Sequence, residues 1–366
     1  MHHGDLAARA RPGEQDRRIT QTMRGQVGAP ATGNVWAFTT GLPARSPADR
    51  EPMSSTSDER AARLATEPLR VAGPRQGFFR GTVQSLRDIL GQRELLSLLV
   101  RRELKAKYKD SALGFFWSLA RPLAMLLVYY IAIGKFLGAE QNPRNLAGIP
   151  DFAVFIFTGL TAWQLFSDIV VGSTGSIVGN GGLIKKVYLP REVFPLSVVG
   201  ASLVNFVIQL AVLVGATAVL GSFPTGGRWG YFVLSLAVLV VWATAVGLLL
   251  SAINVYLRDV QYLIEILIMI LFWASPIIYA WPMVDSRVDG VLEGLYLANP
   301  MTPVVMGFQK AFWVAGDTWE VDGELAAGYP ENLATMLGLT LAASVVALWV
   351  AQRVFARLQA NFAQEL

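Results

Sequence analysis

The chain has 366 residues, of which 53% are hydrophobic and 16% are charged, and its formal net charge is +4. These proportions are more apolar than those of a soluble globular domain and indicate an integral membrane protein. The chain contains no cysteine, and its two histidines are His2 and His3, which excludes thiol chemistry, Ser-His-Asp catalysis and metal sites built on Cys or His. The cations flank apolar stretches, a topology pattern that argues against nucleic acid as a partner.

Residues 1–80 are rich in Arg, Ala, Pro, Gly, Ser and Thr and show no sustained periodicity. Such a segment cannot bury enough apolar surface to offset the entropy of ordering, so we predict a disordered cytoplasmic tail. No apolar core follows the early arginines, so this is not the pattern of a secretory signal peptide. Met53 is a second candidate start of the native protein, in which case the residues before it come from an upstream start codon.

Residues 81–113 predict an amphipathic helix that lies on the inner face of the membrane. Helical spacing gives it an apolar face, formed by Leu86, Ile89, Leu90, Leu96, Val100, Leu104 and Tyr108. Leu95, Leu98 and Leu99 interrupt this pattern in the middle. The opposite face would meet anionic headgroups with Arg101, Arg102, Lys105, Lys107 and Lys109. The alternatives are a target helix for a soluble partner and a soluble packing helix.

Six transmembrane helices can be drawn in the membrane domain, residues 114–352, each close to the ~20 residues that cross the hydrocarbon. They are expected at 116–137, 152–172, 196–221, 230–252, 260–279 and 333–350. The predicted fold is therefore an all-α integral membrane protein.

The cations define the predicted orientation. One set of loops holds Arg80, Arg87, Arg93, Arg101, Arg102, Lys105, Lys107, Lys109, Lys185, Lys186, Arg191, Arg258, Arg353 and Arg357. The opposite set holds only Arg144, Arg228, Arg287 and Lys310. We therefore expect both termini in the cytoplasm, with residues 353–366 as a C-terminal cytoplasmic tail.

The last outer segment, residues 280–332, is long and acidic but contains an apolar stretch with prolines, LANPMTPVVMGFQKAFWVAG. This stretch is too short to span and too apolar for a free loop, which predicts a re-entrant helical segment before the last helix. Pro276 predicts a kink late in span five, where that segment begins. A folded loop on the outer surface is the alternative.

Charged residues inside the spans are candidate functional residues, because the bilayer penalises charge. The charges inside or just at the spans are Arg121, Lys135, Asp168 and Glu265, and snorkelling to the interface is the alternative for Lys135. Arg121, Asp168 and Glu265 all fall toward the predicted cytoplasmic half. Arg121 paired with Asp168 or Glu265 would form an inner gate, whereas snorkelling to the interface is the alternative for Arg121.

Aromatic residues are dense, and those near span ends fit an interfacial belt. The deeper ones are candidates for a channel lining, because sugar rings stack their C–H faces on aromatic side chains. The candidates are Tyr129, Tyr130, Phe157, Trp163, Phe272 and Trp273.

A compact loop is expected between spans two and three. Glycines 179, 181 and 182 permit a sharp exit from span two, and Pro190 and Pro195 prevent a continuous helix into span three. A rigid loop of this kind can transmit a push from a soluble domain. The alternative is a loop whose cations only set topology.

Several activities lack their motifs in this sequence. No G-x-x-x-x-G-K-[ST] phosphate loop is present, so the chain cannot bind ATP in the usual way. A D-x-D motif is also missing, and the large loop faces away from nucleotide sugars, which argues against a glycosyltransferase. An ion-coupled transporter would be expected to show inverted repeats and charged residues deeper in the spans, and this sequence shows neither pattern. We therefore expect a transport subunit that is not an enzyme.

Four stretches together resemble the permease subunits of ABC-2 type polysaccharide exporters. They are RRELKAKYKDSALGFFWSLARP, GNGGLIKKVYLPREVFPLS, the span-five region from NVYLRDVQYLIEI to SPIIY, and LANPMTPVV. The resemblance covers residues 85–366. Within the family, the Arg/Ala-rich tail is most similar to actinobacterial permeases that export lipid-linked galactan for the cell wall.

The resemblance implies a multi-pass homodimer in the bacterial plasma membrane, with two copies of a separate cytoplasmic ATPase that binds ATP and Mg²⁺. The cargo would be a polysaccharide on a polyprenyl diphosphate, moved from the inner to the outer leaflet, with Arg121 near the diphosphate. A drug or small-lipid exporter is the alternative. The implied ATPase-coupling residues are Leu183, Lys185, Lys186, Val187, Tyr188, Leu189, Pro190, Arg191 and Glu192.

Overall fold

The computed structural model describes residues 91–108, 116–139, 149, 151–186, 189–285, 287–288, 290–317, 320–321, 324–325 and 328–366. All of them belong to one unit of the chain, residues 71–366. The predicted tail, the start of the amphipathic helix, Lys109, Val187 and Tyr188 lie outside the described residues.

The longer helices are α3 (Arg93–Tyr108), α4 (Phe116–Tyr129) continued by the π-helix η2 (Tyr130–Phe136), α5 (Phe152–Gly179), α7 (Val193–Val219), α8 (Arg228–Tyr256), α9 (Val260–Trp273), α12 (Met301–Phe312) and α13 (Leu333–Leu358). The short elements are α6 (Gly181–Ile184), α10 (Trp281–Asp285), α11 (Val291–Ala298), η3 (Val314–Asp317), β1 (Glu320–Val321), β2 (Glu324–Leu325), η4 (Gln359–Asn361) and α14 (Phe362–Glu365). Strands β1 and β2 pair antiparallel.

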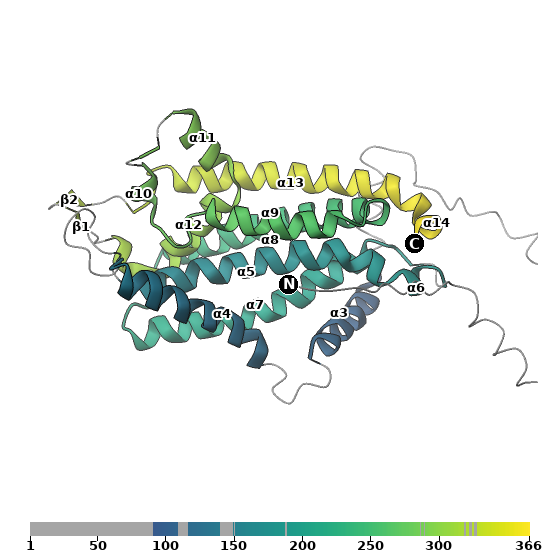
Figure 1. The fold of residues 1–366 in the computed structure, drawn as a ribbon, viewed down its shortest axis with the longest axis horizontal. Helices are drawn as coiled ribbons and strands as arrows, with labels where there is room; N and C mark the ends of the chain where they lie inside the picture. The colour runs from purple at the N-terminus through teal and green to yellow at the C-terminus, as the bar shows by residue number, and fades with distance from the viewer. Residues whose placement is uncertain are drawn as a thin grey trace, which may run out of the picture. The chain divides into compact units, whose positions relative to one another are not determined.

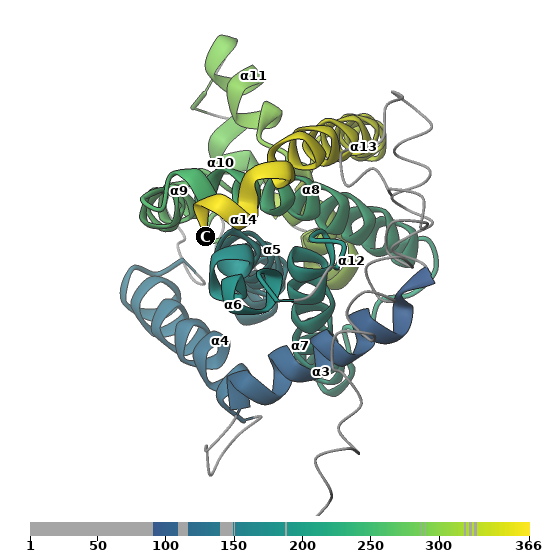
Figure 2. The same cartoon turned by 90° about the vertical axis from the view of Figure 1, so that its right-hand side faces the viewer.

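Helix α5 lies at the centre of the bundle, with α4, α7, α8, α9 and α12 around it (Figure 2). It is apolar on all sides, and such a helix is stable only when it is buried. Small residues allow its neighbours to approach closely. A Cβ added at Gly172 would lie 2.7 Å from Val198 Cγ1, and one added at Gly247 would lie 2.8 Å from Ser173 Cβ. These contacts fix α7 and α8 against α5.

Five helices among the described residues are long and apolar enough to cross a membrane: α4 with η2, α5, α7, α8 and α13. They coincide with five of the six predicted spans. The remaining one, 260–279, differs, because α9 has only 14 residues. At 1.5 Å per residue this is about 21 Å, shorter than the ~30 Å hydrocarbon core.

The predicted kink at Pro276 is wrong, because helix α9 ends at Trp273 and does not continue through the proline. Proline has no N–H to donate and disfavours helical backbone at the residue before it, so the helix ends just upstream. We call residues 274–280 the α9 break. A Cβ added at Gly159 of α5 would lie 3.1 Å from Ile277 Cγ2, so the break packs directly on α5.

Every backbone carbonyl from Ile270 to Pro276 accepts a hydrogen bond. Backbone N–H groups donate to the carbonyl oxygens of Ile270, Phe272 and Ser275. Side chains donate the others: Ser275 Oγ to Leu271 O (2.8 Å), Tyr279 OH to Trp273 O (2.8 Å), Asn299 Nδ2 to Ala274 O (3.3 Å) and Gln309 Nε2 to Pro276 O (2.7 Å). Non-helical backbone is tolerated at membrane depth only where it is paired and covered. All these carbonyls are paired, and residues 275–278 are buried, whereas Trp273 and Ala274 are exposed.

The segment predicted to be re-entrant contains α10, α11 and α12. All residues of α12 except Lys310 are buried, and the helix packs between α5, α8 and α13. A Cβ added at Gly307 would lie 1.9 Å from Ser235 Oγ, so glycine is required for this approach of α12 to α8. A loop on the outer surface, the alternative drawn from the sequence, does not describe α12.

Both ends of the described unit are more structured than the sequence suggested. Helix α13 continues past residue 350 to Leu358, because Ala351 and Phe355 extend its buried face. Residues 359–366, expected in a tail, form η4 and α14, with Phe362 fully buried. In α3, Leu99 is the most buried residue and not an interruption, because the helix packs against protein at α7.

Candidate transport site

A cavity of about 870 Å³ lies among α3, α4, α5, α7 and α9. Its wall contains the three intramembrane charges predicted from the sequence, Arg121, Asp168 and Glu265. It also contains four of the six predicted channel aromatics, Tyr129, Trp163, Phe272 and Trp273. The fold thus brings both groups of candidate residues into one space.

The four aromatics form a connected cluster. Phe272 of α9 is its centre, with ring centroids 6.0 Å from Tyr129, 5.7 Å from Trp163 and 5.8 Å from Trp273. Trp163 and Phe272 are buried, whereas Trp273 is 57% exposed and extends the cluster to the surface of the protomer. Phe272 meets Trp163 and Trp273 edge to face and is stacked with Tyr129, both of which are preferred arrangements of aromatic rings.

Two of the predicted channel aromatics lie elsewhere. Phe157 is buried in the hydrophobic core of the bundle and is not part of the cavity wall. Tyr130 is half-buried, and the Lys135 Nζ lies 5.2 Å from the centroid of its ring. The distance of an aromatic residue from the predicted ends of its span therefore did not show whether its side chain faces the cavity or the hydrophobic core.

Asp168 is held by neighbours that the sequence prediction did not name. The Lys107 Nζ of α3 lies 3.6 Å from Asp168 Oδ2, and Gln164 Nε2 donates to Asp168 Oδ1 at 2.7 Å. The Gln164 contact has i,i+4 spacing and was available from the sequence. The Lys107 contact depends on how α3 packs, and the sequence carried no signal for it.

Arg121 and Glu265 are exposed on the cavity wall. Within the described residues, neither has an ion-pair partner, so the predicted pairing of Arg121 with Asp168 or Glu265 is not formed in this protomer. A guanidinium on a cavity wall can bind an anion through paired N–H donors.

The loop between α5 and α7 has an exposed side and a buried side. Lys185 and Lys186 are exposed, Leu183, Leu189 and Pro190 are half-buried, and Glu192 is buried. We call residues 181–192 the coupling loop. Of the predicted coupling residues, Val187 and Tyr188 lie outside the described part of the chain.

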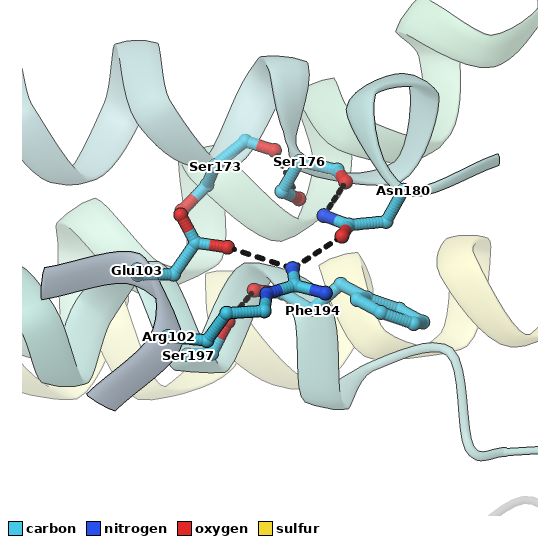
Figure 3. A network of polar contacts seen from close by, with 7 residues as sticks. All are labelled: Arg102, Glu103, Ser173, Ser176, Asn180, Phe194 and Ser197. Carbon is cyan, nitrogen blue, oxygen red and sulfur yellow. Dashed lines mark hydrogen bonds and ion pairs between the residues drawn. The ribbon is translucent and has the colours of Figure 1, made fainter. Parts of the chain in front are cut away.

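Helix α3 is tied to the start of the coupling loop by a polar network (Figure 3). Arg102 Nη2 donates to Asn180 Oδ1 and, at 3.0 Å, to Glu103 Oε1. Asn180 Nδ2 in turn donates to the Ser176 carbonyl of α5 at 2.8 Å. Arg102, predicted to meet lipid headgroups, thus also contacts protein.

The other predicted membrane-facing cations of α3 stay at its surface. Arg101, Lys105 and Lys107 are exposed, as a helix with a cationic face requires. Within the described residues, no group of His, Cys, Asp or Glu could hold a metal ion.

The five described helices that are long and apolar enough to cross a membrane, with a cavity beside the central helix α5, indicate a multi-pass membrane protein. The sequence pattern of the ABC-2 type transporter family matches residues 94–313. This match covers more than half of the chain, and the chain belongs to the ABC-2 type transporter family.

Three relatives of this chain are named as export permeases or as a transport protein. The chain is 32% identical over 286 residues to the O-antigen export system permease protein RfbA of Myxococcus xanthus, covering 78% of this chain and 100% of the relative. It is 30% identical over 220 residues to RfbA of Klebsiella pneumoniae (60% and 80% covered). It is 25% identical over 218 residues to the polysialic acid transport protein KpsM of Escherichia coli (58% and 79% covered).

Proposed function

We propose that this chain is the permease half of an ATP-driven exporter that moves a lipid-linked polysaccharide from the inner to the outer leaflet. Two copies would form the pore, and two copies of a separate ATPase would bind the coupling loops and supply ATP and Mg²⁺ chemistry. The names of the relatives support a polysaccharide cargo.

The observation that carries the proposal is the composition of the cavity wall. Aromatic faces offer stacking for the apolar sides of sugar rings without strong binding at any point, which suits a polymer that slides. Arg121 supplies a donor for a diphosphate near the same space. A cavity for a small apolar drug would have no need of the five charged residues on the wall, which are Glu103, Lys107, Arg121, Asp168 and Glu265.

A homodimer could form through the exposed apolar surfaces of α4 and α9, which otherwise face lipid as the exposed surface of α13 does. In the α4–η2 span, 11% of the most apolar stretch is buried inside the protomer, against 78% in α5. Helix α9 likewise exposes Leu263, Ile266, Leu267 and Ile270. A second protomer placed on these faces would enclose the cavity between two aromatic clusters.

The arrangement of the loops supports the predicted orientation. Segments assigned to the cytoplasm, namely α3, the coupling loop and residues 359–366, gather at one end of the unit, and loops assigned outside gather at the other (Figure 1). The outside group is joined by Arg228, which pairs with Asp317, and by Lys310, whose Nζ lies 2.6 Å from Asp317 Oδ1.

The test is reconstitution of the chain with its ATPase in proteoliposomes that contain a polyprenyl-diphosphate-linked glycan. We expect the ATPase to copurify and the glycan to reach the opposite leaflet only with ATP, and an ATPase lacking its phosphate-loop lysine serves as the control. Transport without ATP, or no ATPase in the purified complex, would reject the proposal. Galactan as the particular cargo stays a prediction, which a comparison of galactan with O-antigen glycans in the same vesicles tests.

Arg121 provides a sharper test of the cavity. Arg121→Gln removes the guanidinium, and we expect the apparent KM for the lipid-linked glycan to rise about tenfold, the effect of losing a charged hydrogen bond. Arg121→Lys keeps the charge and should retain part of the affinity. Equal KM values for the wild-type chain and Arg121→Gln would remove Arg121 from the site.

A further inference from the structure

The coupling loop is in contact with residues 359–366, a segment that the sequence analysis treated as a tail. Gln359 Nε2 of η4 donates to Glu192 Oε1 at 3.4 Å, and Glu192 is 4% exposed. At the other end of the loop, a Cβ added at Gly181 would lie 3.6 Å from the Cβ of Leu366. The two ends of the loop therefore both meet this segment.

Phe362 is the anchor of the segment. Its side chain is fully buried, with ring centroids 5.5 Å from Phe355 of α13 and 6.2 Å from Tyr256 of α8. Tyr256 OH also donates to the Leu358 carbonyl at 2.8 Å, at the end of α13. The segment is thus fixed to two long helices before it reaches the loop.

Arg191 connects the loop to this anchor. Its guanidinium carbon lies 5.7 Å from the centroid of the Phe362 ring, within the range of a cation–π contact. Arg191 is half-buried, whereas Lys185 and Lys186 on the same loop are exposed. The loop thus presents its two lysines to a partner and places Arg191 against its own protein.

We propose that residues 359–366 form a clamp that positions the coupling loop for the ATPase, with Phe362 and Arg191 as positioning residues. This inference rests on the proposed function, because it assumes that an ATPase binds the loop. It assigns Arg191 a role different from the one that the family resemblance implies, in which its charge would meet acidic residues of the ATPase. The clamp transmits force because it joins the loop to α8 and α13.

The contact itself is tested by a disulfide. The chain has no cysteine, so Gly181→Cys together with Leu366→Cys introduces the only thiols. The expected Cβ separation lies within the usual 3.5–4.5 Å of a disulfide. In membranes that contain the full chain and its ATPase, we expect the pair to crosslink on oxidation and ATP-dependent export to continue. If no crosslink forms, residues 359–366 do not contact the loop and the clamp is rejected. If the crosslink forms but export is lost completely, the segment has to leave the loop during export, which also contradicts the proposal.

The positioning role is tested by variants on the two sides of α14. Phe362→Ala should lower ATP-dependent export about tenfold at equal membrane level, within the range typical of coupling between two sites. Phe362→Leu should recover part of it, because leucine still fills the buried position. Gln364→Ala, on the exposed side of the same helix, is the matched control and should behave as the wild-type chain.

Arg191→Gln separates positioning from folding. We expect the ATPase concentration that gives half-maximal export to rise while the thermal midpoint of the permease stays within a few degrees of wild type. Because Arg191 and Phe362 act through one contact, the double variant should lose no more than Phe362→Ala alone. Independent losses that multiply would overturn the proposal and return Arg191 to direct contact with the ATPase.

The outcomes distinguish this inference from the proposed function. If the wild-type chain binds no ATPase, the proposed function fails, and the crosslink still reports whether the clamp exists. If the wild-type chain exports with ATP and Phe362→Ala equals Gln364→Ala in export, the proposed function stands and the positioning role is rejected.

Discussion

The two ends of the helical unit differ in how they hold backbone that is not helical. At the α9 break, seven consecutive carbonyls, Ile270 to Pro276, are paired, and several of their donors come from buried or half-buried side chains such as Gln309 and Asn299. At the coupling loop, Lys185 and Lys186 are exposed, and the tie from Arg102 lies at the surface. One end is closed by internal bonds, and the other leaves the side chains of Lys185 and Lys186 exposed.

This difference has an energetic reason. An unpaired backbone group inside a membrane costs several kcal/mol, so the α9 break is stable only with all its donors in place. Exposed charged contacts contribute about 0–1 kcal/mol each, so loss of the Arg102 contact with Asn180 should cost little stability. We therefore expect the largest losses of stability from substitutions near the break.

Gly307→Ala should give the largest effect. The new methyl group would meet Ser235 Oγ at 1.9 Å, in a contact between two packed helices, and overpacking of this kind costs about 1–3 kcal/mol. Thermal unfolding of the purified chain in detergent measures it. Gly294→Ala in α11 is the matched control, because nothing lies within 4 Å of its added Cβ.

A second substitution identifies the cause of the Gly307→Ala effect. Ser235→Gly removes the colliding hydroxyl and Cβ, so the double variant should regain most of the lost stability. A double variant no more stable than Gly307→Ala would mean that the loss does not come from this contact.

Gln309→Met should have the next largest effect. Methionine keeps the length of the side chain but leaves the Pro276 carbonyl without its donor, at a cost of about 1–3 kcal/mol. The comparison is Gln209→Met in α7, which is also buried but whose Oε1 has no hydrogen-bond partner among the described residues. We expect little loss, or a gain, at Gln209. Equal unfolding midpoints for both variants would contradict the paired break.

The sequence predicted the regular helices well and the break only in part. Five spans followed from runs of apolar residues, because length and hydropathy are properties of one segment. Pro276 indicated a disturbance in span five, but the donors Asn299 and Gln309 come from residues distant in the sequence. The extent of the break depends on those donors, and no local pattern reports them.

The sequence predicted which residues belong to the candidate site better than it predicted which side chains contact each other. Charge inside a span, together with a position toward the cytoplasmic half, selected Arg121, Asp168 and Glu265, and all three lie on the cavity wall. Lys135, which is also charged but lies toward the other half, does not. The contact of Lys107 with Asp168 and that of Arg191 with Phe362 are set by how α3 and residues 359–366 fold back on the bundle. Helical periodicity gives the faces of a helix but not the neighbour that each face meets.

A double-mutant cycle on Lys107 and Asp168 should give a smaller effect. The two charged atoms are 3.6 Å apart and the Lys107 side chain is 51% exposed, so the coupling energy should be about 0.2–1 kcal/mol and should decrease with added salt. Arg121→Glu combined with Asp168→Arg tests the alternative pair. Rescue in that combination, with no coupling between Lys107 and Asp168, would favour a gate built on Arg121.

Tyr329→Phe should give the smallest effect near neutral pH. The Tyr329 hydroxyl is buried and has no hydrogen-bond partner among the described residues, while its ring contacts Trp313 and the Lys310 ammonium. Phenylalanine keeps the ring contacts and removes an unpaired polar group, so the unfolding free energy should be equal or slightly higher.

Raising the pH should lower the stability of the wild-type chain more than that of Tyr329→Phe. Burial, and then the charge of Asp317, raise the pKa of Tyr329 well above its ordinary value of 10.0. Above pH 10 the unfolded chain therefore loses this proton while the folded chain keeps it, so the stability contributed below pH 10 declines as the pH rises. Tyr329→Phe has no such proton to lose. Its stability should consequently decline less than that of the wild-type chain between pH 10 and 11, as measured by denaturant unfolding, and identical declines would place the Tyr329 hydroxyl in water.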